Sequence, residues 1–543
     1  MDKDAIVELV NNSYRSQPKY DEIQAGLPED YKDIKTLGDL LNISYKHASV
    51  YTQLSKNLIN KRKNNENPYH GIIGYDDDVI PSTDRAILAR HDILYIGEIG
   101  QAKTKLAETI AKNLLSPMPV IKGSTMNDVP TTLPAEHLIS LLLDQEVIRT
   151  TPEFYIGKDS EEEIRNNGLD TRIEWRSGLE RYRYILATPD ISIKDLVGQI
   201  DAIKVAKKGV EIYDIASYSP GQLLQARHGI LCIDELPVLD PRKQVVLLSV
   251  LQEGRFTTGS YPVIFKPECK IIATANPIDY THVGKIIEPL YDRLKSHIRT
   301  HYPNTLEDEM IIMVQEAHSP SKDAFLPLFI LKILARITQS LRKHPEVNKE
   351  KGVSVRIGIY ALELVLSEAY RTRGIYNDIQ VIPRPSDLHA INQSIKFELS
   401  DIDDTIENRN NLLKQVMADC IAETSREYLN DITNISDIRD EFMRNKIFYT
   451  SQIMLGEGGE SYTEQLKRFP SLNAAILKIK ERVKMEHEEF VKLLVKYGID
   501  KDLLILKNMN GEFHASVTEI VLECLRSLRP PVIDKREGGY ETI

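Results

Sequence analysis

The chain has 543 residues, enough for about three or four domains of roughly 150 residues each. Its 42% hydrophobic and 27% charged residues are typical of a globular protein that builds a large core without disulfides or metals. The net charge of −11, from 80 acidic and 69 basic residues, disfavours a general nucleic-acid-binding protein, because phosphate binding needs a basic face.

The four cysteines are dispersed and form no Cys-x-x-Cys pair, which excludes the common zinc and redox motifs and is typical of a reducing cytoplasm. The first residues, MDKDAIVELVNNSYR, lack the apolar core of a signal peptide. No apolar run approaches the ~20 residues that span a bilayer. We therefore expect a cytoplasmic protein without a membrane segment.

Residues 1–66 are polar and are expected to form an N-terminal helical region. This region ends in KNLINKRKNNENPYH, where charged and Asn-rich residues followed by proline are typical of a domain boundary. The positive run could contact nucleic acid, but a solvated helix end is the simpler interpretation.

Residues 67–305 alternate between short apolar strands and helices. The strands that are apolar throughout are Ile93–Ile96, Pro119–Ile121, Ile230–Ile233 and Ile271–Thr274. Continuous apolar strands favour a parallel sheet that is buried on both faces. A helical apolar pattern follows the first strand, so we expect an α/β domain with three layers.

The remainder of the chain is expected to be helical. Ile357, Tyr360, Ala361 and Leu364 fall on one face of a helix, which places residues 306–400 in a helical region. Residues 401–543 form a further helical region with a long helix from about 473 to 497. Its Gly-rich stretch LGEGGES is predicted to be a loop, because it lacks the basic and hydroxyl residues of a phosphate loop.

A candidate phosphate loop follows the first strand. The stretch GEIGQAKT at 97–104 fits G-x-x-x-x-G-K-[ST], with Ala102 in place of the second glycine. Such a loop turns backbone N–H groups toward phosphates, and the following helix N-terminus adds partial positive charge. Lys103 would supply a charge to the phosphates and Thr104 a hydroxyl to Mg²⁺. A Gly-rich turn without a ligand is the alternative, and the acidic residues described next make it the weaker one.

Polar residues follow two later strands. Asp234 and Glu235 end the strand GILCIDE, and Asn276 follows the strand that ends at Thr274. Ligands of parallel α/β sheets bind at the carboxyl edge of the strands. Asp234 would hold Mg²⁺, Glu235 would polarise the attacking water, and Asn276 would orient that water from the opposite side. The structural alternatives are an acidic strand end and a turn-forming asparagine before proline.

The distance between the loop and the acidic pair predicts insertions. Lys103 and Asp234 are 131 residues apart (234 − 103), so residues 125–218 are expected to contain inserted segments. They include the patch DTRIEWRSGLERYRYILATPD, which could be a partner or nucleic-acid surface or a folded subdomain packed on the core. Residues 254–267 have the pattern of a β-hairpin with Gly259-Ser260 at its turn.

Several longer stretches resemble the AAA+ superfamily, and within it the branch that contains the magnesium-chelatase motor subunit and the MoxR ATPases. They are PGQLLQARHGILCIDELPVL (220–239), VLLSVLQEGRF (246–256), IIATANPIDY (271–280), EPLYDRLKSHIRTHYP (288–303) and GVSVRIGIYALELV (352–365). The resemblance covers roughly residues 70–400. It implies a P-loop AAA+ domain over 67–305, with the hairpin as an insertion, and a helical lid over 306–400.

The resemblance also implies residue roles. Arg293 matches the arginine that reaches the γ-phosphate of a neighbouring subunit, although Leu294 replaces the usual phenylalanine, and Arg299 is the reserve candidate. Arg356 matches the lid arginine that senses nucleotide, and HGIIGY (70–75) matches the adenine pocket. The implied catalytic residues are Glu235, Asn276, Arg293 and Arg356. The implied nucleotide-binding residues are Ile73, Gly97, Gly100, Gln101, Ala102, Lys103, Thr104 and Lys105, with Thr104 and Asp234 as metal ligands.

The leading functional hypothesis is an ATP-hydrolysing motor with ATP and Mg²⁺ as cofactors. It would remodel a client, or insert a metal, as a ring that is commonly a hexamer. The family generally works with a von Willebrand A domain, which needs Asp-x-Ser-x-Ser. The nearest string here, Asp190-Ile-Ser-Ile-Lys194, lacks the second serine, so such a partner would be a separate protein.

Two alternatives stay open. A magnesium-chelatase motor for tetrapyrrole synthesis fits the same motifs, although the long terminal additions disfavour it. A nucleic-acid-dependent ATPase, either a helicase or a transcription regulator, is disfavoured by the net charge and by the lack of a Gly-Ala-Phe-Thr-Gly-Ala-type loop. A catalytically inactive scaffold is disfavoured by the intact Lys103, Thr104, Asp234 and Glu235.

Overall fold

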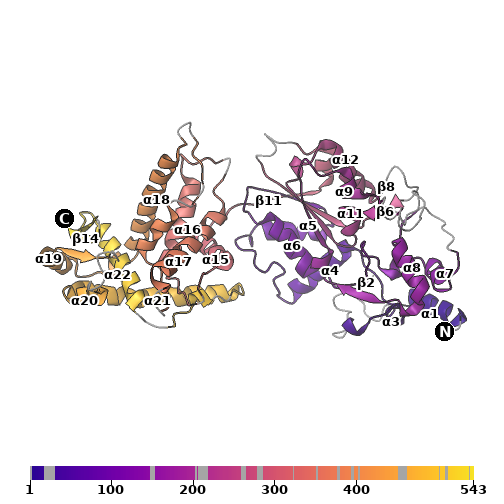
Figure 1. Cartoon of the computed structure of the whole chain (residues 1–543), viewed down its shortest axis with the longest axis horizontal. Coiled ribbons are helices and arrows are strands. Elements are labelled where there is room, and N and C mark those ends of the chain that lie inside the picture. The colour runs from indigo at the N-terminus through magenta and orange to yellow at the C-terminus, as the bar shows by residue number, and fades with distance from the viewer. Residues whose placement is uncertain are drawn as a thin grey trace. The chain divides into compact units, whose positions relative to one another are not determined.

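The computed structural model divides the chain into two compact units, Met1–His301 and Tyr302–Ile543, which are described separately (Figure 1). The structure describes residues 3–16, 31–146, 153–201, 205, 218–257, 264–277, 285–321, 323–349, 352–375, 379–392, 395, 397–400, 404–450, 461–499, 502–507, 511–536 and 538–543.

The first unit is built around a parallel sheet of five strands. Their order is β11 (Ser296–Arg299), β1 (Ile93–Ile96), β10 (Lys270–Ala275), β7 (Ile230–Asp234) and β4 (Tyr182–Leu186). Every neighbouring pair in this sheet is parallel. Strands β1, β7 and β10 are apolar along nearly their whole length because helices cover both faces of the sheet. The predicted parallel three-layer sheet is therefore confirmed.

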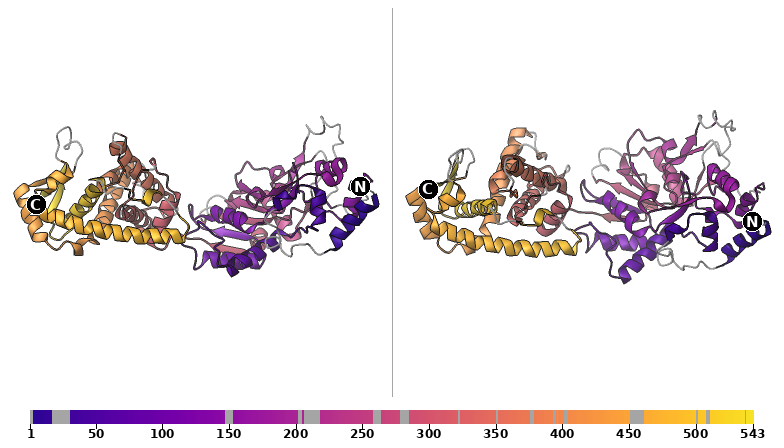
Figure 2. Two further views of the ribbon diagram at one scale, coloured as in Figure 1. Left: turned by 90° about the horizontal axis from the view of Figure 1, so that it is seen from below. Right: turned by 60° about the horizontal axis from the view of Figure 1, so that its bottom comes forward.

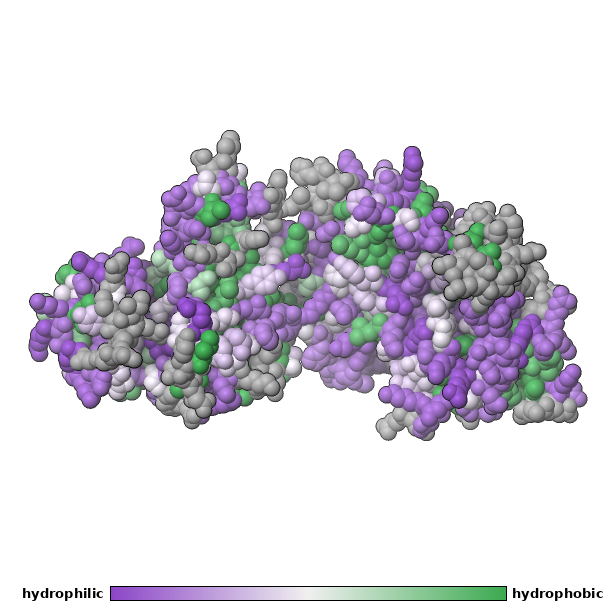
Figure 3. Space-filling view, in the orientation of Figure 1, coloured by the Kyte–Doolittle hydropathy of each residue, from purple (hydrophilic) through white to green (hydrophobic). Residues whose placement is uncertain are grey.

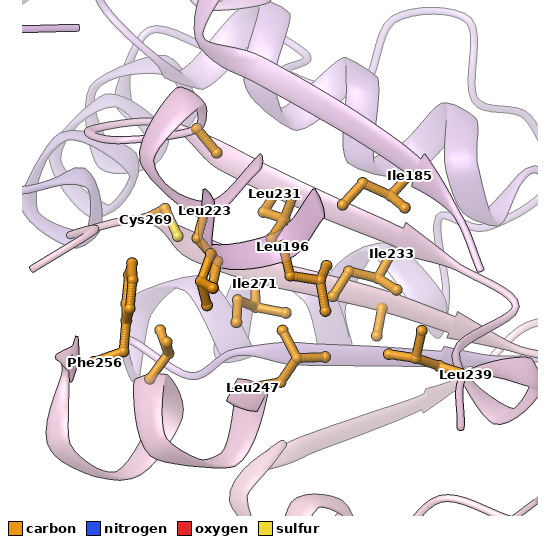
Figure 4. Packing of buried hydrophobic residues seen from close by; sticks show 14 of the residues in the cluster. Ile185, Leu196, Leu223, Leu231, Ile233, Leu239, Leu247, Phe256, Cys269 and Ile271 are labelled. Atoms are coloured by element: carbon orange, nitrogen blue, oxygen red, sulfur yellow. The ribbon is translucent and has the colours of Figure 1, made fainter. Parts of the chain in front are cut away.

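Alternate residues of the strands enter two separate cores. On one face Tyr95 and Cys232 pack against α6 (Lys103–Leu114), together with α4 (Val50–Lys63) and α5 (Val79–Leu88). On the other face Leu231 and Ile271 pack against Leu247, as Figure 4 shows. That face is covered by α9 (Ile193–Val197), α11 (Gln222–Gln225), α12 (Pro241–Glu253) and α14 (Glu288–Arg293).

One predicted strand of the parallel sheet is wrong. Residues 119–121 belong to β2 (Met118–Ile121), which pairs antiparallel with β3 (Ile173–Arg176) in a separate two-stranded sheet. The fifth parallel strand is β4, inside the range expected to be inserted. It lies at the sheet edge and only Ile185 is buried, so it has no continuous apolar run. Strand β2 is apolar because it is buried in two smaller hydrophobic clusters outside the five-stranded sheet. An apolar run therefore indicates that a strand is buried, but it does not indicate which strand it pairs with.

The remaining elements of the first unit surround this frame. Helices α1 (Lys3–Arg15), α3 (Leu37–Asn42), α7 (Ala135–Leu142) and α8 (Lys158–Asn167) gather around β2. Strands β5 (Gly198–Ile200) and β6 (Tyr218–Pro220) pair antiparallel, as do β8 (Phe256–Thr257) and β9 (Ile264–Phe265). The turn predicted at Gly259-Ser260, between β8 and β9, lies outside the described residues.

The second unit is mainly helical. Its helices are α15 (Leu306–Glu316), α16 (Leu328–Lys343), α17 (Val355–Ala369), α18 (Ile406–Arg426), α19 (Ile435–Asn445), α20 (Tyr462–Leu466), α21 (Pro470–Lys496) and α22 (Gly511–Arg526). The long helix α21 runs along one side of this unit (Figure 2). Strands β12 (Ile447–Tyr449), β14 (Gly539–Thr542) and β13 (Ile533–Arg536) form a small sheet that the helical prediction missed. These strands have only three or four residues each, which is too short to leave a periodic signal.

The face shown in Figure 3 is mainly hydrophilic with scattered apolar residues. Among the described residues, no helix combines the length and apolarity needed to cross a membrane.

Candidate functional site

The predicted loop and acidic residues meet at the carboxyl edge of the five-stranded sheet. The Gly97 amide donates to the carbonyl of Ala275 at 3.0 Å, which joins the end of β1 to the end of β10. The Ala187 amide donates to the carbonyl of Asp234 at 2.8 Å, which joins β4 to β7. Because only β10 separates β1 from β7, the loop and the acidic pair lie about 10 Å apart, two strand spacings.

The loop conformation depends on small residues. A Cβ atom on Gly97 would lie 2.0 Å from the hydroxyl oxygen of Thr300 and 2.2 Å from the side-chain oxygen of Gln101, so only glycine fits there. Gly100 has a φ of +82° and Ala102 a φ of +53°, both in the left-handed region. The extra methyl of Ala102 therefore costs about 1–2 kcal/mol more than glycine would in the same conformation.

A buried polar network holds the loop against its neighbours. The carboxamide oxygen of Gln101 accepts from the Glu98 amide at 3.1 Å and from the Thr300 hydroxyl at 2.7 Å. The Tyr75 hydroxyl lies 2.8 Å from the carbonyl of Gln101. Tyr75 is buried, as is Ile73, so the segment predicted to line the adenine pocket is packed beside the loop.

Lys103 lies at the start of α6 with its ammonium inside the loop. Its Nζ donates to the carbonyls of Gly97 at 2.5 Å and Glu98 at 2.7 Å. Thr104 and Lys105 follow in the first turn and are both half-buried. Ala102 is the N-cap of α6 and forms no side-chain cap hydrogen bond, and the N-terminus of a helix directs partial positive charge toward an anion.

The acidic pair is organised by Thr274 and Tyr184. The Thr274 hydroxyl donates to Asp234 Oδ1 and accepts from the Glu235 amide at 3.0 Å. The Tyr184 hydroxyl donates to Asp234 Oδ2 at 3.0 Å. Glu235 has a φ of +55°, in the left-handed region, so the extended strand ends between the two acidic residues. Asn276 follows β10 at the same edge and is half-buried.

The three arginines lie in different places. Arg293 ends α14, and its side chain is 40% exposed and forms an ion pair with Asp292. The reserve candidate Arg299 is exposed on β11 opposite Ile96, beside the loop of its own chain. Arg356 is exposed in the first turn of α17 and belongs to the second unit. Apart from Arg356 and Arg293, the predicted site residues lie together in the first unit. The predicted role of Arg293 needs a neighbouring subunit.

Sequence reasoning missed Thr274, Thr300 and Tyr184 as site residues, whereas Tyr75 belongs to the segment predicted to line the adenine pocket. A threonine at the end of an apolar strand is a weak signal, but Thr274 is fully buried and precedes the predicted site residue Asn276. Tyr184 lies in the patch predicted to be a partner surface or a subdomain, and it was not assigned to the site because its edge strand was not recognised. Partial burial and then the neighbouring Asp234 carboxylate raise the pKa of Tyr184 to about 12, so its hydroxyl stays a hydrogen-bond donor at neutral pH.

Magnesium chemistry is compatible with these residues. The carboxylate of Asp234 and the hydroxyl of Thr104 are oxygen donors of the kind that Mg²⁺ prefers. Within the described ranges there is no group of three or more His, Cys, Asp or Glu side chains that could hold a metal alone. Mg²⁺ is usually held by one or two side chains together with substrate phosphates, so the small number of protein donors is compatible with it.

Comparison with known proteins finds a family match within the first unit. Residues 176–294, from just before β4 to the end of α14, match the family described as AAA domain (dynein-related subfamily). The chain is 26% identical to the uncharacterized protein YeaC of Bacillus subtilis over 37% of this chain and 66% of that protein. It is 26% identical to the ATP-dependent protease PrkA of the same organism, over 47% of this chain and 43% of that protein.

The magnesium-chelatase subunit ChlI of Cyanophora paradoxa is 24% identical over 49% of this chain and 76% of that protein. Among solved structures, a complex of the magnesium-chelatase subunits BchI and BchD aligns with 63% of this chain and 98% of that chain, at 15% identity and a TM-score of 0.31. The family match and the relatives confirm the predicted resemblance to AAA+ ATPases of the magnesium-chelatase branch.

Proposed function

Because the chain carries an AAA+ ATPase domain similar to magnesium-chelatase subunits, we propose that it is an ATP-hydrolysing motor. The observation that carries the proposal is the meeting of two groups at one sheet edge. Lys103 and the amides of the phosphate loop lie there beside the acidic pair Asp234 and Glu235. A phosphate-binding loop with an adjacent carboxylate pair suits hydrolysis of a nucleoside triphosphate.

Each group has a distinct role in this proposal. The loop amides and the N-terminus of α6 bind the phosphates, and Lys103 moves from the carbonyls of Gly97 and Glu98 to the phosphate oxygens. Thr104 and Asp234 hold Mg²⁺, which neutralises charge on the phosphates when bound. Glu235 accepts a proton from the attacking water, and Asn276 orients that water.

The site is completed by a second copy of the chain. Arg293 is half-exposed at the end of α14, and among the described residues its ion pair is with the adjacent Asp292, so it can be redirected to a phosphate of a neighbouring subunit. We infer a ring, commonly a hexamer, in which Arg356 follows the nucleotide state. The ring would act on a client through a separate protein with a von Willebrand A domain.

A magnesium-chelatase motor is the second candidate function. It is favoured by the relatives named magnesium-chelatase subunit. The match to the subunit ChlI of Cyanophora paradoxa covers 76% of that protein. Addition of a chelatase partner and porphyrin substrate tests it, because stimulated magnesium insertion distinguishes this candidate from a general remodelling motor.

Two substitutions test the hydrolysis proposal. Lys103→Ala should lose binding of a fluorescent ATP analogue, whereas Glu235→Gln should bind it and release phosphate at least about 100-fold more slowly. Lys112→Ala and Glu108→Gln are matched controls, because both residues are exposed on α6 away from the loop. Wild-type turnover in Lys103→Ala, or a normal rate in Glu235→Gln, would contradict the proposal.

A further inference from the structure

The hydroxyl of Tyr184 contacts the carboxylate assigned to magnesium. In the sheet register Tyr184 lies opposite Cys232, and Asp234 lies two residues further along the same face of β7. The side chain of Tyr184 reaches across this diagonal and donates to Asp234 Oδ2 at 3.0 Å. Tyr184 is 47% exposed, so it adds little to the core, and its polar contact is the feature to explain.

Two hydroxyls, one from each strand next to β7, donate to the Asp234 carboxylate. Thr274 of β10 donates to Oδ1, and Tyr184 of β4 donates to Oδ2. A carboxylate has about four acceptor positions, so each oxygen keeps acceptor capacity after these two bonds. Because both oxygens are fixed, the carboxylate cannot rotate freely about its last torsion. Its remaining acceptor positions therefore have a defined direction.

We propose that Tyr184 is a positioning residue that orients Asp234 for the metal ion of the nucleotide site. The inference rests on the proposed function, since it needs a nucleotide-bound Mg²⁺. Groups that orient a metal ligand raise affinity by reducing the reorganisation that binding requires, and their removal typically costs about 10- to 100-fold in metal affinity. Tyr184 is half-exposed and competes with water, so we expect the lower end, about 10-fold.

Tyr184→Phe removes only the hydroxyl, and the ring keeps its place on the edge strand. Tyr182→Phe is a matched control, because Tyr182 lies two residues earlier on the same face of β4 and faces Ile230 rather than Asp234 in the register. Asp234→Asn provides the reference for loss of the metal carboxylate. None of these changes alters the loop or Lys103.

The measurement is Mn²⁺ affinity by electron paramagnetic resonance with a saturating non-hydrolysable ATP analogue, together with binding of the same analogue in EDTA. Tyr184→Phe should weaken Mn²⁺ binding about 10-fold and leave analogue binding in EDTA unchanged. Tyr182→Phe should change neither quantity.

An unchanged Mn²⁺ dissociation constant in Tyr184→Phe, with the analogue still bound, overturns the inference and leaves the proposed function intact. Equal weakening by Tyr182→Phe also overturns it, because the effect would then belong to the strand rather than to the contact. If wild-type protein binds no analogue, the proposed function and the inference both fall.

Discussion

Thr274 allows the sharpest test of how the acidic pair is organised. Its hydroxyl is fully buried, donates to Asp234 and accepts from the Glu235 amide. Thr274→Val keeps the shape of the side chain but removes both hydrogen bonds. A hydrogen bond to a charged group contributes about 1.5–3 kcal/mol, and a buried amide without a partner costs about 1–3 kcal/mol.

Asp234 is half-exposed and can accept a hydrogen bond from water in place of the Thr274 hydroxyl. We therefore expect Thr274→Val to raise the activation free energy of hydrolysis by about 2 kcal/mol. This corresponds to roughly a 30-fold fall in kcat. The assay is steady-state phosphate release at saturating ATP and Mg²⁺, with thermal unfolding measured in parallel.

Thr274→Ser is the matched control, because serine keeps the hydroxyl and loses the methyl group. It should lose some stability through a small cavity but retain most of the turnover. A turnover rate of Thr274→Val within two-fold of wild type would refute the reasoning. Equal loss in the serine and valine variants would also refute it, since packing rather than the hydroxyl would then be responsible.

Three further predictions concern the loop, the shared interface and acid stability. Ala102→Gly should be tolerated in thermal unfolding and nucleotide binding, whereas Ala102→Val should lose at least about 1–2 kcal/mol, because a branched side chain is disfavoured at a φ of +53°. Arg293→Ala should lose turnover and regain part of it when mixed with Glu235→Gln, because each subunit supplies what the other lacks; mixtures no more active than the separate variants would argue against a shared site. Burial lowers the pKa of His228 well below its usual value. The unfolded chain therefore binds more protons than the folded chain below a pH of about 6.5. The free energy of unfolding should fall as the pH drops further, by up to ~1.4 kcal/mol per pH unit. His228→Asn removes this group while tolerating its φ of +56°, so urea unfolding should show a shallower acid slope, and an unchanged slope would assign the sensitivity elsewhere.

The sequence predicts the centre of the sheet well because burial on both faces demands continuous apolar strands. Ile93–Ile96 and Ile230–Ile233 are such strands, and their ends place the loop and Asp234 at one edge. The same rule failed at the sheet edge. Strand β4 has one face open to solvent and reads as polar, whereas β2 reads as a core strand because it is buried elsewhere.

The contacts that support the site are less predictable than the site residues themselves. Lys103 and Asp234 belong to short motifs whose chemistry restricts the residue type. Tyr184 and Thr274 act across strands, so their partners depend on register and strand order, which the sequence pattern alone does not specify. The choice of β4 as the fifth strand is what brings Tyr184 to Asp234.

Buried ion pairs in the second unit connect the segment that follows α17 to α22. Arg373, which follows α17, forms ion pairs with Asp387 at 2.6 Å and with Glu512 at 2.9 Å. Arg384 also pairs with Glu512, at 2.7 Å, so residues after α17 are tied to α22 through groups that are largely shielded from water. Removing one partner of such a buried pair leaves an uncompensated charge and lowers the free energy of unfolding by about 3–5 kcal/mol. These pairs therefore connect the end of the helix that carries Arg356 to α22.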